Sequence, residues 1–418
     1  MLTKYKLGEL VDVTRGMSLP GENYSESGEL IRLTLGNFNY NGGGFKENAS
    51  KSDIYYIGEV KSEYILYKGD IITPLTEQTL GLLGSTAMIP ESGKYIQSQD
   101  VALVTPDESK LDRFFCYYLV SSDVVRKQLS AAAQQTKIRH TSPDKIKDCT
   151  VWIPELKLQE KIGKTLYDID QKISLNTRMN AELEAMAKQL YDYWFVQFDF
   201  PDEKGKPYKS SGGKMVWNEK LKREIPEGWE VSTYGDVFDV KLGGTPSTTE
   251  KGFWENGTIH WLNSSEVQSF PVNDSEKKIT KLAINNSSTE FLPKGSVLIS
   301  ITRYLRVTVL NIDACINQSV AGFAETDDYK YAYTYFSLSA EVPRLMTLRS
   351  GAQQPHINKE TVENSPFLLP PLTVLEEYYK NANPLIGLLI KKSEETKKLT
   401  HLRDSLLPML MNGQVTIE

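Results

Sequence analysis

The sequence predicts a mixed α/β (α+β) protein in which two related globular lobes are joined by two long helices, paired as an antiparallel coiled coil. Two observations lead to this fold class: an internal repeat about half the chain long, and a heptad-like spacing of apolar residues after each copy. The length of 418 residues suits two to three domains at roughly 150 residues each. Hydrophobic residues make up 40% and charged residues 24%, which is typical of a globular protein with well-formed cores.

The repeat is carried by four landmarks that recur in the same order. Residues 7–13 recur as 234–240, residues 68–72 as 294–298, residues 133–135 as 352–354, and residues 153–154 as 369–370. Short loops gained or lost between the landmarks account for the drift in their spacing. We therefore predict one lobe at residues 1–150 and a second at residues 229–365.

Short apolar runs and turn signals inside the lobes favour the mixed class. Ile71-Ile72 and residues 296–301 follow Lys-Gly turns and are expected to be buried strands. Residues 113–129 and 329–348 are rich in Tyr, Phe and Leu and are expected to be helices. The pattern does not order the strands.

A long helix is predicted after each lobe, within residues 151–199 and 366–418. Apolar residues there recur every three or four positions, and a mean period of about 3.5 indicates a coiled-coil seam. Both seams are polar at the centre, with Asn176 and Asn180 in the first copy and Lys392 and Thr396 in the second. The predicted seam consists of Ile162, Leu166, Ile169, Ile173, Leu183, Leu190, Leu385, Leu389, Leu399, Leu406 and Leu410.

The direction of pairing follows from topology, because two helices that each leave their own lobe most simply run in opposite directions. The alternative is two separate amphipathic helices, each packed on its own lobe. Residues 200–228 are rich in Gly, Pro, Ser and Lys and are expected to form an extended connector.

Several functional classes are excluded by composition and motif content. The net charge of −6 excludes a histone-like protein, and three cysteines are too few and scattered for a disulfide framework or a zinc knuckle. The sequence shows no secretion signal and no transmembrane stretch, so we expect a cytoplasmic protein without membrane contact. It has no phosphate-binding glycine loop, and its four histidines are isolated, so neither a nucleotide nor a metal is expected.

Two motifs suggest catalysis only weakly. Residues 364–367, Asn-Ser-Pro-Phe, resemble the loop of amino-methyltransferases, but the glycine-rich turn that seats a methyl donor is missing. Asp144, Glu155 and Lys157 have the spacing of a metal-dependent nuclease, but the second copy replaces Glu155 and Lys157 with proline and threonine. A stand-alone nuclease or methyltransferase is therefore the less favoured hypothesis, and no catalytic or metal-binding residue is predicted.

Local charge favours nucleic acid as the partner. Residues 121–147 hold six basic side chains against two acidic ones, whereas residues 341–364 of the second lobe hold three of each sign. Amides suit adenine, while basic groups suit guanine or phosphate. The predicted DNA-binding residues are Arg15, Gln134, Gln135, Lys137 and Arg139 in the first lobe, and Arg303, Arg306, Gln353, Gln354 and His356 in the second. The alternatives are solvated surface groups and a coiled-coil adaptor that does not read DNA.

The length of the first helix limits the distance between two DNA half-sites. Residues 158–196 span about 58 Å at 1.5 Å per residue, or at most about 17 base pairs. Two half-sites about one helical turn apart fit within this length.

The chain resembles the specificity subunit of a Type I restriction–modification system over its whole length. The resemblance rests on the order of segments that are weak individually: residues 228–231, 235–237 and 243–247, the Lys-Gly turns at Lys68 and Lys294, residues 369–372, and the connector at 205–213. Residues 15–18 depart from the family's Gly-Gly-Thr-Pro turn, and residues 159–160 and 375–376 depart from its Glu-Gln helix start.

The resemblance implies that each lobe is a target recognition domain that reads one half of a split, asymmetric DNA sequence. It implies that the helices bind two modification subunits, which use S-adenosylmethionine to methylate adenine, and that restriction subunits add ATP- and magnesium-dependent cleavage. No cofactor is then expected in this chain. The family also implies a cyclic, pseudo-twofold arrangement in which the C-terminal helix returns beside the N-terminus.

Overall fold

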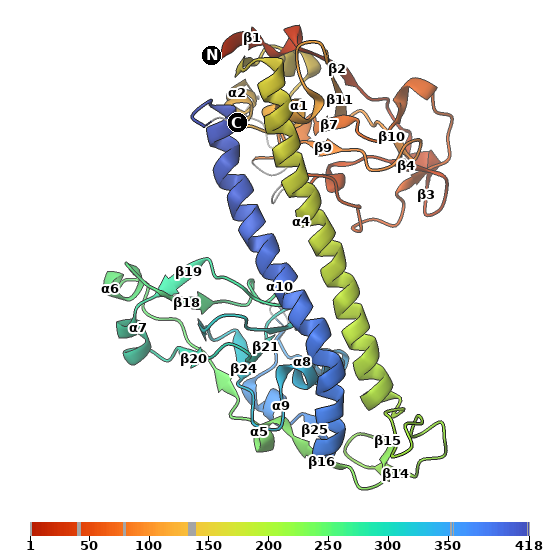
Figure 1. Ribbon diagram of the computed structural model, residues 1–418, viewed down its shortest axis with the longest axis vertical. Coiled ribbons are helices and arrows are strands. Elements are labelled where there is room, and N and C mark those ends of the chain that lie inside the picture. The colour runs from red at the N-terminus through yellow and green to blue at the C-terminus, as the bar shows by residue number, and fades with distance from the viewer. Residues whose placement is uncertain are drawn as a thin grey trace. The chain divides into compact units, whose positions relative to one another are not determined.

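A computed structural model describes residues 2–39, 43–77, 81–132, 139–351, 353, 355–415 and 417 (Figure 1). The chain forms two compact units, one made of residues 1–174 and 398–418 and the other of residues 175–397. Each predicted lobe lies within one unit, and the two long helices, α4 (Leu156–Tyr191) and α10 (Leu372–Met411), each contribute to both.

Lobe 1 is built on two sheets and the strand pair described next, and it also contains the short pair of β8 (Thr76–Glu77) and β12 (Arg139–His140). The strand pair joins β1 (Thr3–Lys6) to β13 (Thr150–Ile153). The first sheet has the order β2 (Val11–Arg15), β11 (Val101–Pro106), β7 (Ile71–Pro74), β9 (Ala87–Met88). The second has the order β3 (Tyr24–Ser25), β5 (Tyr55–Tyr56), β4 (Leu30–Arg32), β10 (Tyr95–Ile96), β6 (Ile65–Leu66). The lobe's helices are α1 (Arg113–Val120), α2 (Asp123–Ala132) and α3 (Pro143–Lys147).

Lobe 2 has the same plan. Its strand pair joins β16 (Glu230–Thr233) to β25 (Pro366–Leu369). The first sheet has the order β17 (Lys241–Leu242), β24 (Val320–Phe323), β21 (Val297–Ser300), β22 (Val307–Val309). The second has the order β19 (Lys277–Ile279), β18 (Ile259–Leu262), β23 (Ala314–Ile316), β20 (Glu290–Leu292). The helices are α5 (Tyr234–Val237), α6 (Lys251–Trp254), α7 (Lys281–Asn285), α8 (Tyr331–Thr347) and α9 (Lys359–Glu363).

The two strand orders confirm the mixed α/β class and show the internal repeat as repeated topology. The parallel pair β4–β10 of lobe 1 corresponds to the parallel pair β18–β23 of lobe 2. The Lys-Gly turns precede the buried strands β7 and β21, and Gly69 and Gly295 both have φ +90°. This left-handed conformation favours glycine because it has no Cβ. Lobe 1 adds one strand, β3, at the edge of its second sheet.

The helix expected at residues 113–129 is two helices, α1 and α2, so that prediction was wrong in its extent. The break falls at Ser121, whose hydroxyl donates to the carbonyls of Tyr117 and Tyr118 at 3.2 Å. Serine side chains compete in this way for the backbone groups of a helix. The helix expected at residues 329–348 is α8.

In the first unit, α10 packs against α4 and lobe 1. Ile162 and Leu166 of α4 share one core with Leu410 and Met411 of α10. Closer to the middle of both helices, Arg403 Nη1 lies 2.8 Å from Asp170 Oδ1. Residues later in α4 therefore contact residues earlier in α10, so the two helices are antiparallel (Figure 1).

The second unit has the same antiparallel pairing. Asn176 Nδ2 donates to Glu395 Oε2 at 3.1 Å, and the rings of Trp194 and Tyr378 lie 5.7 Å apart.

Neither long helix, nor any other helix in the described part of the chain, is long and apolar enough to cross a membrane. The eleven predicted seam residues, Ile162, Leu166, Ile169, Ile173, Leu183, Leu190, Leu385, Leu389, Leu399, Leu406 and Leu410, are all buried or half-buried.

At the polar centre of the seam, Asn176 of α4 bonds to Glu395 of α10 within this unit. Asn176 is fully buried beside Glu395, and Glu395 also accepts a hydrogen bond from Lys392 at 2.9 Å. A buried polar residue such as Asn176 helps to fix the register of a coiled coil, because a shifted pairing would leave it without its partner.

The connector at residues 200–228 is folded rather than extended, contrary to the prediction. It contains a hairpin of β14 (Met215–Asn218) and β15 (Arg223–Pro226). Tyr208 stacks on Phe200 at 4.8 Å between ring centroids, and Trp229 stacks on Phe200 at 5.0 Å. These aromatic contacts fix a segment whose Gly, Pro and Ser content is otherwise typical of a linker.

We predict that Arg403→Ala lowers the free energy of unfolding of the first unit by about 1–3 kcal/mol. Arg403 bonds to Asp170 and to Asp404, and Asp170 also accepts a hydrogen bond from the Tyr118 hydroxyl at 2.5 Å. Burial raises the pKa of Tyr118, which keeps that hydroxyl protonated as a donor. The loss is smaller than for a fully buried pair because both carboxylates keep contact with solvent.

Urea denaturation monitored by circular dichroism measures the Arg403 effect. Lys161→Ala, at an exposed position of α4, is the matched control and should change stability by less than about 0.5 kcal/mol. Equal stability of the Arg403→Ala variant and the parent protein would contradict a structural role for this ion pair.

Candidate nucleic-acid interface

In lobe 2, the turn between β21 and β22 lies against the segment that follows α8. Thr302 and His356 form an isolated β-bridge, and the N–H of Ile357 donates to the carbonyl of Ile301 at 3.0 Å. The structure therefore brings together, from two separate stretches, the predicted residues Arg303, Arg306 and His356, all of them exposed. Gln353 is also exposed and lies three residues before His356.

The backbone at Arg303 is held in an unusual conformation. Its φ of +55° is in the left-handed region, which side chains other than glycine rarely adopt. Its N–H donates to the carbonyl of Pro355 at 2.8 Å, and its own carbonyl accepts from Nη1 of Arg349 at 2.5 Å. Such a conformation persists only where surrounding contacts enforce it, and it is common at binding sites.

Charge at this turn is more basic than the sequence count of lobe 2 suggested. The acids responsible for that count lie on helices: Glu341 pairs with Arg344 at 2.7 Å, and Glu363 pairs with Lys359 at 3.2 Å. Residues 300–311 and 342–358 contain no Asp or Glu. The turn thus presents arginines, and neither of the two sequence segments that form it contains an acidic residue.

Lobe 1 builds the equivalent site as a short strand pair, β8 (Thr76–Glu77) with β12 (Arg139–His140). The N–H of Thr141 donates to the carbonyl of Leu75 at 2.8 Å, which matches the bond from Ile357 to Ile301 in lobe 2. The residue two positions after each of these carbonyls is Glu77 in lobe 1 and Arg303 in lobe 2. The two lobes therefore place opposite charges at the same point of the fold.

Glu77 is a buried carboxylate that organises the loop after β8. It is 2% exposed, and its Oε2 accepts hydrogen bonds from the N–H groups of Gly81, Leu82 and Leu83 at 3.0 to 3.1 Å. Arg139, one of the predicted DNA-binding residues, has Nη1 3.7 Å from Glu77 Oε1 and is half-buried. Glu77 therefore limits the freedom of Arg139, and it leaves that guanidinium partly open to solvent.

Arg15 lies at the same end of the first sheet of lobe 1. Arg15 and Thr73 both pair with Ala102. Thr73 lies near the end of β7, and β8 begins three residues later. The side chain of Arg15 is exposed, and its Nε donates to the carbonyl of Gln99 at 3.0 Å. Arg15 is therefore available to a ligand that approaches this end of the sheet.

Four predicted contact residues fall outside the described residues: Gln134, Gln135, Lys137 and Gln354. Their roles stay predictions. The hydrogen bonds place Thr141 of lobe 1 in the position of Ile357 of lobe 2.

Sequence reasoning missed two residues at these turns. Tyr304 stands between the two arginines of lobe 2 and is 67% exposed, and Glu77 anchors the loop of lobe 1. The signal for Tyr304 was present in the sequence, since an aromatic residue between arginines on a loop is typical of a nucleic-acid contact. The signal for Glu77 was absent, because three backbone donors from one loop become visible only in three dimensions.

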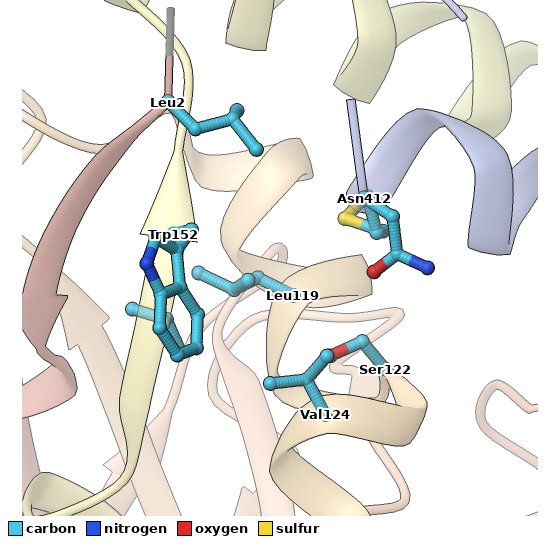
Figure 2. Close-up of a pocket in the computed structure, with 8 residues that line it drawn as sticks. Leu2, Leu119, Ser122, Val124, Trp152 and Asn412 are labelled. Atoms are coloured by element: carbon cyan, nitrogen blue, oxygen red, sulfur yellow. The ribbon is translucent and has the colours of Figure 1, made fainter. Parts of the chain in front are cut away.

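A separate small cavity lies in the first unit, where the end of α10 approaches α2 and β13 (Figure 2). Its volume is about 160 Å³, and its lining is mostly apolar, with Leu2, Leu119 and Trp152 on one side and Asn412 on the other. None of the predicted contact residues lines it. Its lining includes Leu2, near the N-terminus, and Met411 and Asn412 at the end of α10.

The repeat of lobe and helix is matched by a family of known proteins. The sequence model of the Type I restriction modification DNA specificity domain matches residues 2–185 and 226–396. The chain belongs to this family. The two matched ranges each cover one lobe and most of the helix that follows it, which confirms the resemblance read from the sequence.

Two curated specificity subunits are similar to this chain. The MjaIX subunit of Methanocaldococcus jannaschii is 24% identical over 316 residues, covering 73% of this chain and 69% of that protein. The HindI subunit of Haemophilus influenzae is 22% identical over 373 residues, covering 77% and 81%. The crystal structure of the Type I S subunit from M. genitalium superposes with a TM-score of 0.61 at 16% identity, covering 98% of this chain and 96% of that one. That likeness shows that this specificity subunit shares the fold.

Proposed function

We propose that this specificity subunit reads a bipartite, asymmetric DNA target, with lobe 1 on one half-site and lobe 2 on the other. The observation that carries this proposal is the equivalent turn in the two lobes. The backbone of this turn has an equivalent hydrogen bond in both lobes. The turn nevertheless presents Arg139 beside the buried Glu77 in lobe 1, and Arg303, Arg306 and Tyr304 in lobe 2. Different side chains on the same frame suit two different base sequences, because base identity is read by side chains while phosphate contacts only position the protein.

The helices would serve as the binding surface for two modification subunits. Apolar side chains are exposed along both, including Leu175 and Met186 on α4 and Leu388 and Leu402 on α10. Contiguous exposed apolar patches mark protein interfaces, and these side chains would contribute to such a contact with the modification subunits. Restriction subunits would join the full complex, and S-adenosylmethionine, ATP and magnesium would bind to these partners and not to this chain.

The chain itself would be non-catalytic. Asp144 lies on α3, whereas Glu155 and Lys157 lie at the start of α4, and all three are exposed to solvent. Asn364 is the exposed C-cap of α9. A nuclease or methyltransferase would instead hold these groups in a shielded site, where charge stabilisation is strong.

Exchange of lobe 1 tests the division of labour directly. Replacing residues 1–150 with the first lobe of another family member should change one half-site completely and leave the other unchanged. Methylome sequencing of cells that express the hybrid with its modification subunit gives the result. A change in both half-sites, or in neither, would overturn the proposal, and methylation by the isolated chain would show that it is an enzyme.

The adaptor alternative makes a different prediction. A coiled-coil adaptor that does not read DNA would show no salt-sensitive affinity for duplex DNA after assembly with its partners. For a DNA reader, log affinity should fall steeply with log salt, by about 0.9 for each phosphate contacted. Arg303→Ala combined with Arg306→Ala should reduce that slope by up to about 2.

A further inference from the structure

The turn between β21 and β22 exposes an aromatic side chain to an unusual degree. Tyr304 is 67% exposed, more than any other large hydrophobic side chain in the described part of the chain. Its neighbour Leu305 is 6% exposed and packs into the core of lobe 2. The turn is therefore anchored on one side and presents its aromatic ring on the other.

The backbone that carries Tyr304 is held rigidly by Ser300. The hydroxyl of Ser300 donates to the carbonyl of Tyr304 at 2.7 Å and accepts from the N–H of Arg306 at 2.9 Å. Arg303 is fixed from the other side by Pro355 and Arg349. An aromatic ring on such a turn loses little conformational entropy when it binds, so its contact area contributes more fully to affinity.

Arg303 and Arg306 stand on either side of Tyr304 in the sequence of this turn, and both are exposed. Some DNA-binding proteins combine basic side chains with apolar side chains that wedge between base steps. Tyrosine also stacks on bases through its π-face. An acidic protein surface would pair with the arginines but would gain less from the ring.

We propose that Tyr304 is a base-contacting residue of lobe 2, whose ring packs against bases of the half-site while Arg303 and Arg306 bind the flanking phosphates. This inference rests on the proposed function and adds a specific residue to it. The contact belongs to lobe 2, because lobe 1 has the buried Glu77 where lobe 2 has Arg303. The two lobes thus grip their half-sites by different chemistry.

Substitutions at Tyr304 in the assembled complex with the modification subunits test the proposal. The probe is a fluorescein-labelled duplex that carries the recognition sequence found by methylome sequencing, and affinity is measured by anisotropy at one fixed salt concentration. Tyr304→Phe keeps the ring and should bind within about twofold of the parent complex. Tyr304→Ala should bind roughly tenfold or more weakly, the scale of one lost base–aromatic contact.

Tyr67→Ala is the matched control, because Tyr67 is 59% exposed on a turn of lobe 1. It should leave affinity unchanged. A second readout uses 2-aminopurine placed in turn at each position of the half-site. Its fluorescence should change on binding at one step, equally for the parent and Tyr304→Phe, and the change should be lost for Tyr304→Ala.

The outcomes separate this inference from the proposed function. If the parent complex does not bind the duplex specifically, the proposed function fails. If the parent complex binds and Tyr304→Ala binds equally well, only the inference fails. Equal loss in the Phe and Ala variants would assign the contact to the hydroxyl and overturn the proposal. So would weaker assembly of Tyr304→Ala with the modification subunits, since the ring would then be a protein contact.

Discussion

Lengthening both long helices by seven residues should move the two DNA half-sites apart without changing the bases read in either. The insertion points are between residues 174 and 175 in α4 and between residues 397 and 398 in α10. These points face each other in the pairing, since Asp170 meets Arg403 on one side and Asn176 meets Glu395 on the other. Seven residues preserve the phase of the seam.

The size of the shift follows from helix geometry. Seven residues add about 10.5 Å of helix, so the spacer should become one to about three base pairs longer. The parent target should lose its methylation, because two half-sites at the old spacing can no longer be held together. Methylome sequencing of cells that carry the variant and its modification subunit measures the new spacing.

An insertion in α4 alone is the control for this experiment. It should abolish methylation, because the Asp170–Arg403 contact on one side of the insertion and the Asn176–Glu395 contact on the other can then no longer form together. An unchanged spacer after the double insertion, or altered half-site bases, would show that the helices do not set the distance.

Phe195→Ala should lower the free energy of unfolding of the second unit by about 3–5 kcal/mol. Phe195 is fully buried at the end of the first long helix, in the π-helical segment Asp192–Val196. Its ring centroid lies 4.7 Å from that of Tyr333 on α8 and 4.9 Å from that of Tyr378 on α10. Truncation leaves a cavity where the helix pair, lobe 2 and the connector meet.

Chemical denaturation and target methylation measure this effect together. Val196→Ala is the matched control, because the neighbouring Val196 is 43% exposed and should change stability by less than about 0.5 kcal/mol. The Phe195→Ala variant should also lose methylation at 37 °C, since lobe 2 is no longer fixed to the helices. Parent-like stability would show that the aromatic cluster does not hold the unit together.

The repeat and the helix pair could be predicted from the sequence because both are linear patterns. Lys68-Gly69 and Lys294-Gly295 mark equivalent turns by residue type alone, since φ +90° favours glycine. The seam residues recur at 3.5-residue spacing whatever the rest of the fold does. The family could also be predicted from the sequence, because the resemblance rests on the order of such segments.

The two equivalent turns, at β8 and β12 in lobe 1 and between β21 and β22 in lobe 2, could not be predicted in the same detail. Arg303 and Arg306 were found because basic residues on a loop are visible in sequence. Their neighbour Tyr304 was overlooked although it stands between them, and the extent of its exposure became visible only in the structure, where Leu305 turns inward. Glu77 looked like one acid among many, and only the fold places three backbone N–H groups of a loop around it. The prediction of an extended connector was wrong for a related reason, since Phe200, Tyr208 and Trp229 stack only after the chain folds back.

The sequence by itself determined that this protein has two related lobes, each followed by a long helix, because hydrophobic period and turn chemistry are local properties. Only the tertiary structure decided which side chains meet at the turn of each lobe. The equivalence of Glu77 and Arg303 depends on hydrogen bonds between segments more than 50 residues apart, and no local pattern encodes such a contact. The difference between the two lobes, on which the proposed reading of two half-sites depends, is therefore a property of the fold.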